Sequence, residues 1–189
     1  LGGGYQSKGD VYVAEGAEMS LEEGACVRMQ NGHSLYVDGV LVAENETVAD
    51  SIVGGAESGA LSIRQGGSLS LKNANLVGLN NVLVSNGSME MTGGTLDTRS
   101  HLWTQSGATA TLNGVTVKDT INSYGALSLT NCEFDLTRVN VYSGSSAVIS
   151  GCDTISQLTI SLNSDCTITG NDFTNTAIVL TDLAEGKTI

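Results

Sequence analysis

Acidic residues recur at nearly constant spacing in the second half of the chain. Glu133, Asp153 and Asp172 are separated by 20 and 19 residues. If this spacing is one turn of a repeated structure, carboxylates on adjacent turns lie close enough to raise a pKa or to share a hard cation such as Ca²⁺. Such pairs are the raw material of a glycosidase or a calcium-dependent lyase.

A second set of charged residues follows the same spacing, two positions further along. It consists of Asp97, Lys118 and Asp135, which we predict to contact a ligand. A chain with 20 acidic residues would align several of them by chance, and Lys118 would then only relieve repulsion. Catalysis by Glu133, Asp153 and Asp172 is therefore the alternative hypothesis, and no metal site or cofactor is predicted.

Aromatic residues offer a different kind of site. His101 and Trp103 lie near one junction of the repeat, and Tyr124 follows about one repeat later. An exposed aromatic ring beside polar groups can pack against a sugar ring, so Trp103 and Tyr124 are predicted ligand-binding residues. A Trp that only fills a corner of the fold explains the pattern as well.

The four cysteines, Cys26, Cys132, Cys152 and Cys166, lack the paired C-x-x-C spacing of zinc or redox sites. They are expected to be small buried hydrophobic residues. Cys132 and Cys152 are one repeat apart, where a disulfide is the alternative to two free thiols.

The repeat that must position these residues is visible in six segments. Each has an apolar residue, a polar one, then Asn or Gly, and the starts are separated by 20, 21, 17, 20 and 19 residues. The third positions are Asn73, Gly93, Gly114, Asn131, Gly151 and Gly170. Gly and Asn enter left-handed backbone geometry most cheaply, so this column predicts a sharp corner on every turn.

Apolar residues alternate on both sides of that corner, as in Leu69/Leu71 before it and Val115/Val117 after it. A third apolar stretch, such as Val82–Val84, completes each turn. Three short strands per rung of roughly 20 residues, stacked at about 4.8 Å, predict an all-β, right-handed parallel β-helix. Leucine-rich repeats are the runner-up, but their L-x-x-L-x-L framework is not consistently present.

The first part of the chain is a variant of this theme. Residues 16–21 and 32–37 are predicted to repeat at a spacing of 16. The segment GDVYVAEGAEMSLEEGACVRMQNGHSLYVDGVLVAE, together with the later rung L-T-N-C-E-F, resembles bacterial surface proteins of the pectate-lyase-like, right-handed β-helix superfamily. The resemblance covers about residues 10–180 and implies the fold; none of the superfamily's catalytic motifs can be placed on this chain.

Composition limits the function. The chain has 189 residues, 40% of them hydrophobic, with 24 Gly and no Pro, which suits one solenoid domain over residues 1–189. Residues 1–10 are predicted to cap one end, and residues 181–189 to be a second cap or the start of a further segment. The formal net charge of −12 disfavours nucleic acid, and no apolar run predicts membrane insertion.

Three functions follow from these observations. The first is an extracellular or cell-surface module for adhesion, which binds a glycan or a surface protein without catalysis. The second is a polysaccharide-active enzyme, a lyase or glycoside hydrolase, that uses the stacked carboxylates. The third is a structural spacer of a longer surface protein.

Overall fold

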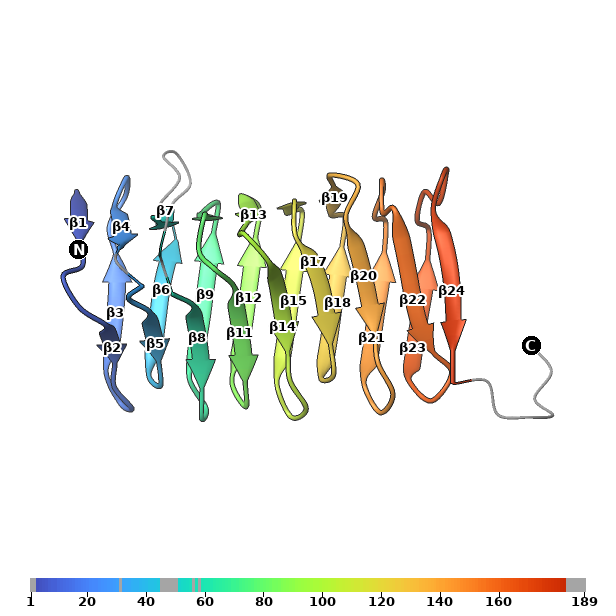
Figure 1. The fold of residues 1–189 in the computed structure, drawn as a ribbon, viewed down its shortest axis with the longest axis horizontal. Helices are drawn as coiled ribbons and strands as arrows, with labels where there is room; N and C mark the ends of the chain where they lie inside the picture. Colours follow the sequence, from blue (N-terminus) through green and yellow to red (C-terminus); the bar gives the residue numbers. More distant parts are fainter. Residues whose placement is uncertain (1–2, 31, 45–50, 56, 58, 183–189) are drawn as a thin grey trace.

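The computed structural model describes residues 3–30, 32–44, 51–55, 57 and 59–182, and throughout these residues the chain is an all-β solenoid. Three parallel sheets run along its length (Figure 1), and the chain visits sheets A, B and C in turn for about eight turns. Successive rungs are lined up along the long axis, from β1 at one end to β24 at the other. The predicted parallel β-helix with three strands per rung is confirmed.

The strands are short, and each sheet collects every third one up to β21; after that, strands of sheets B and C alternate. Sheet A contains β1 (Gly4–Gln6), β4 (Cys26–Met29), β7 (Ser51–Gly54), β10 (Asn75–Val77), β13 (Thr95–Asp97), β16 (Thr116–Val117) and β19 (Glu133–Phe134). Sheet B contains β2 (Val11–Val13), β5 (Leu35–Val37), β8 (Leu61–Arg64), β11 (Val82–Ser85), β14 (His101–Thr104), β17 (Thr120–Ser123), β20 (Arg138–Val141), β22 (Gln157–Ser161) and β24 (Ala177–Thr181). Sheet C contains β3 (Glu18–Leu21), β6 (Val40–Glu44), β9 (Ser68–Lys72), β12 (Ser88–Thr92), β15 (Thr109–Asn113), β18 (Ala126–Thr130), β21 (Ser146–Ser150) and β23 (Asp165–Thr169).

The corner between sheets C and A is the left-handed column that the sequence predicts. All six residues of the column have positive φ: Asn73 (52°), Gly93 (66°), Gly114 (63°), Asn131 (51°), Gly151 (63°) and Gly170 (65°). At two places space also demands glycine, because a Cβ on Gly93 or Gly151 would lie 2.4 Å from the side-chain oxygen of the Asn on the preceding rung.

Apolar side chains at every second position of the strands fill one continuous core. Leu127 and Leu129 of β18 point inward, while Ser128 between them stays on the outer face. Val115 and Val117, which follow the Gly114 corner on the preceding rung, have exposures of 0%. Because no single rung can bury its apolar face alone, the stacking itself creates the interior.

The N-terminal rungs differ from the prediction. Residues 16–21 and 32–37 do not occupy equivalent positions, because β3 belongs to sheet C and β5 to sheet B. The true partner of Met19 is Leu41, on the strand that follows β5. The two segments share a local alternation of apolar and polar residues, but backbone pairing sets the register, and these rungs are longer than the later ones.

Residues 1–10 are predicted to cap one end, and residues 181–189 to be a second cap or the start of a further segment. At one end, Gly4–Gln6 form strand β1, which pairs with β4 as the first strand of sheet A. At the other end, Thr181 closes β24, and residues 183–189 lie outside the described part of the chain.

Candidate functional site: the outer face of sheet B

The predicted carboxylate row lies on the sheet A side of the solenoid. Thr116 pairs with Glu133, and Glu133 forms a parallel bridge with Asp153. Stacking therefore brings Glu133 and Asp153 onto adjacent rungs, and both are exposed. Asp172 follows one rung later, where its amide N donates to the carbonyl oxygen of Cys152 at 2.9 Å.

The Asp172 carboxylate is directed at its own turn. It accepts a hydrogen bond from the Thr174 amide at 2.8 Å, and hydrogen bonds from the Thr174 hydroxyl and amide lower the pKa of Asp172. A general acid needs a raised pKa, which burial or a neighbouring carboxylate would supply. The geometry gives Asp172 the opposite shift.

The second charged set lies beside this row. Lys118 Nζ is 3.5 Å from Asp97 Oδ2, so these two residues form an exposed ion pair. An open hollow of about 370 Å³ is lined by Lys118, Glu133 and Asp135, among others, but not by Asp153 or Asp172. Among the residues that the structure describes, no three His, Cys, Asp or Glu side chains are grouped to hold a metal ion.

Sheet B carries an aromatic row, defined here as Trp103, Tyr124 and Tyr142. Trp103 is in β14, and the two tyrosines directly follow β17 and β20. The Tyr124 and Tyr142 rings are stacked with centroids 4.3 Å apart, and the Trp103 and Tyr124 rings lie 6.3 Å apart and nearly parallel. The stacked tyrosines cover each other's facing sides, which leaves their edges and the indole of Trp103 at the outer face.

Amide side chains border the aromatic row. Trp103, Asn122 and Asn140 occupy one column of the sheet, on three successive rungs. Asn140 Nδ2 donates to Asn122 Oδ1 at 2.9 Å, and the Tyr142 hydroxyl donates to the same oxygen at 3.1 Å. Burial, followed by the charge of Tyr124, raises the pKa of Tyr142. These bonds tie Tyr142 of the aromatic row, and Asn140 beside it, to Asn122.

A second aromatic cluster lies on the same sheet nearer the N-terminal end. Tyr12 and Tyr36 are partners on adjacent rungs, with ring centroids 4.9 Å apart. The Arg64 guanidinium lies 4.5 Å from the Tyr36 centroid and donates to both oxygens of Asp38 at 2.9 and 2.6 Å. These hydrogen bonds raise the pKa of Arg64.

The distribution of aromatic residues singles out sheet B. The chain has one Trp, five Tyr and two Phe. Five of these eight belong to the two clusters on sheet B. Of the other three, Tyr5 is in β1 of sheet A, Phe134 is buried and Phe173 packs against the core. Tyr, Trp and Arg are the residues enriched at recognition surfaces.

The predicted ligand-binding residues thus fall into two groups. Trp103 and Tyr124 come together on sheet B, whereas Asp97, Lys118 and Asp135 lie in or directly after strands of sheet A. Tyr142 and the two asparagines are not among the residues predicted from the sequence. Tyr142 follows Tyr124 by one rung, and that spacing was the available signal.

The cysteines do not add a reactive centre to this face. All four are free thiols; Cys132 and Cys152 are buried, whereas Cys26 and Cys166 are half-buried. A hydrogen bond with the Cys152 thiol lowers the pKa of Cys132 to about 7, and the same bond raises the pKa of Cys152. Both thiols are 1% exposed, so this polarised pair faces the core.

No helix among the described residues is long and apolar enough to cross a membrane. Comparison of the chain with protein-family models, with curated proteins and with solved structures found no match.

Proposed function

We propose that this chain is an extracellular, cell-surface β-helix module that binds carbohydrate on the outer face of sheet B and serves adhesion rather than catalysis. The observation that carries the proposal is the concentration of five of the eight aromatic residues on that one face. The resemblance of residues 10–44 to bacterial surface proteins of the pectate-lyase-like superfamily supports the cell-surface location and a bacterial source.

The chemistry of the face favours a sugar. Sugars present C–H groups and hydroxyls side by side, and the aromatic row presents an indole and tyrosine edges beside the half-buried Asn140 amide. Asn122 is 3% exposed and lies beneath them as the acceptor of their hydrogen bonds. Tyr and Trp provide rigid contact area at low entropic cost. The stacking and the amide hydrogen bonds fix these side chains in advance, which lowers the cost of binding further.

The alternative enzyme rests on a separate observation, the hollow that contains Lys118, Glu133 and Asp135. A polysaccharide lyase or glycoside hydrolase at this place would need Glu133, and Glu133→Gln would then abolish turnover of its substrate. A structural spacer would need neither face, and substitutions on both would leave its role unchanged.

The test is a glycan array probed with the wild-type protein and with single Trp103→Ala, Tyr124→Ala and Tyr142→Ala variants. Each lost aromatic contact contributes about 0.5–1.5 kcal/mol, so affinity should fall roughly two- to tenfold per variant. The matched control is Val40→Ala, which removes an exposed apolar side chain from sheet C. Equal binding by all variants, or binding of protein partners but no glycan, would refute the proposal.

A further inference from the structure

The corner between sheets B and C changes length from rung to rung. Four residues, 105–108, connect β14 to β15, and four residues, 142–145, connect β20 to β21. The rung between them uses only Tyr124 and Gly125 to connect β17 to β18. The short corner contributes to a short rung: fewer residues of sequence separate Thr109 from its partner Ala126 than separate Ala126 from its partner Ser146.

The short corner, Tyr124–Gly125, lies against the backbone of the longer corner 105–108 on the preceding rung. A Cβ on Gly125 would lie 2.3 Å from the carbonyl oxygen of Gln105 and 2.5 Å from that of Ala108. Only glycine fits so close to another backbone. The corners on either side therefore project beyond the short one, and a hollow of about 390 Å³ opens between them.

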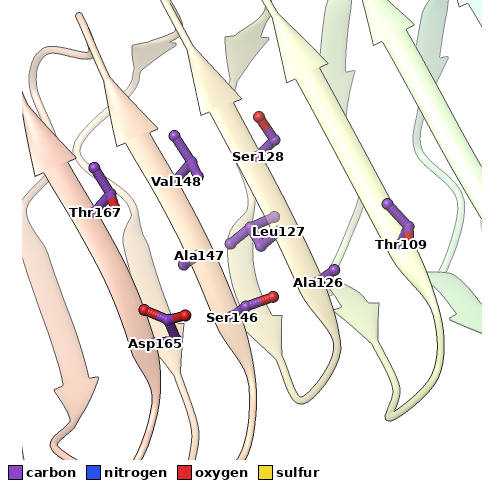
Figure 2. Close-up of a pocket in the computed structure, with 9 residues that line it drawn as sticks. All are labelled: Thr109, Ala126, Leu127, Ser128, Ser146, Ala147, Val148, Asp165 and Thr167. Carbon is purple, nitrogen blue, oxygen red and sulfur yellow. The ribbon is translucent and has the colours of Figure 1, made fainter.

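We call this hollow the corner recess; its lining includes Ser106, Gly107, Tyr124, Gly125, Ser145 and Asp165. It continues onto the outer face of sheet C as a smaller depression of about 260 Å³, which shares Thr109, Ala126, Ser146 and Asp165. Figure 2 shows these four residues in one row across adjacent strands. Ala126 is the smallest side chain of the row, which deepens the floor.

Tyr124 joins the corner recess to the aromatic row. It is 42% exposed, lines the recess, and stacks on Tyr142. We propose that the corner recess is a subsite for a neutral sugar residue of the ligand whose neighbouring residues contact the aromatic row. This inference rests on the proposed function and adds to it the place of specificity and the class of ligand.

The lining determines that class. Asp165 is the one charged side chain among the residues that line the recess and the depression, and the others that are polar carry hydroxyl groups. An ionised carboxylate only accepts hydrogen bonds, so it suits the donor hydroxyls of a sugar. It repels the carboxylate of a uronic acid, as does the net charge of −12. The recess, of about 390 Å³, is open to solvent, so a sugar residue would lie against its wall rather than be enclosed.

The experiment fills the recess and keeps all three side chains of the aromatic row. Insertion of Ser-Gly between Tyr124 and Gly125, combined with Gly125→Ser, turns the corner into the Tyr-Ser-Gly-Ser sequence of residues 142–145. Because exposed corners tolerate insertions, the rung should still stack. The matched control is the same Ser-Gly insertion between Asn86 and Gly87, another two-residue corner of the same edge. Two point variants, Asp165→Ala and Ala126→Met, leave the backbone unchanged.

Binding is measured by calorimetry with neutral tetrasaccharides of glucose, mannose and xylose and with a tetragalacturonate. The wild type should bind at least one neutral probe and the uronate more weakly. Asp165→Ala should weaken binding of the neutral probe about tenfold, the cost of losing a charge-assisted hydrogen bond. The lengthened corner should weaken it at least as much, because it fills the space that the sugar residue would occupy. The Asn86–Gly87 insertion should bind as the wild type does, and circular dichroism confirms that each variant is folded.

The outcomes separate the two proposals. If the wild type binds none of the four probes, carbohydrate binding itself fails. The second outcome is that the wild type binds a neutral probe and the Trp103→Ala variant does not. If the lengthened corner, Asp165→Ala and Ala126→Met then all bind that probe as tightly as the wild type, the recess is not a subsite. Tighter binding of the tetragalacturonate than of every neutral probe overturns the predicted ligand class.

Discussion

Replacing Gly114 with alanine measures what the left-handed corner costs a residue with a side chain. Gly114 has φ of 63°, and a Cβ built on it meets nothing within 4 Å. The substitution therefore isolates the conformational term, about 1–2 kcal/mol for an L-residue in this region. Alanine also reduces the entropy of the unfolded chain, which offsets about 0.4–1 kcal/mol. The net expected loss of stability is about 1 kcal/mol.

Gly151 provides the matched comparison because its φ is also 63°. Here a Cβ would lie 2.4 Å from Asn131 Oδ1, so the Asn131 side chain must leave its rotamer. That adds about 0.5–1.5 kcal/mol. In an Asn131→Gly background the obstruction is gone, and Gly151→Ala should then cost no more than Gly114→Ala.

The assay is urea unfolding followed by circular dichroism, with midpoints compared at constant slope. A change in slope would show that rungs unfold separately, as long repeat arrays can. The reasoning is refuted if Gly114→Ala is neutral or stabilising, or if Gly151→Ala costs the same in both backgrounds.

Three further predictions concern charged and ionisable groups. Burial raises the pKa of Asp119, which is 2% exposed and accepts hydrogen bonds from the Thr98 amide at 2.9 and 3.0 Å. The folded state thus holds the Asp119 proton more tightly, and this contribution to stability is lost as pH rises through the raised pKa. Asp119→Asn should therefore gain stability relative to wild type as pH rises above about 4, the ordinary carboxyl pKa. A pH-independent difference in urea midpoints would contradict this. The raised pKa of Tyr142 means that its ionisation destabilises the folded state. Above about pH 10 the Tyr142→Phe variant should therefore lose stability less steeply than wild type does. Unfolding measured together with an absorbance titration of tyrosinate checks this. The Arg64–Asp38 ion pair, whose side chains are 36% and 28% exposed, should show a coupling of no more than about 1 kcal/mol in an Arg64→Met, Asp38→Asn double-mutant cycle, and the coupling should shrink with added salt.

The sequence alone determined the architecture over the later rungs. The Asn73-to-Gly170 column predicted the left-handed corners correctly, because backbone conformation is a local property and few residue types tolerate positive φ. Period-two alternation likewise placed Leu127, Leu129, Val115 and Val117 inside. Both signals are contained within a few residues of chain.

Tertiary structure decided what depends on pairing between rungs of unequal length. Residues 16–21 and 32–37 have similar sequence patterns, yet they lie in different sheets. The register follows the hydrogen bonding between whole rungs and not the local pattern, and it pairs Met19 with Leu41. The contacts of Tyr142 with Tyr124 and Asn122, and the recess left by the two-residue corner at Tyr124, arise only where three successive rungs meet. Sequence spacing indicates which residues share a rung position; the lengths of the corners set which side chains touch and where the surface is hollow.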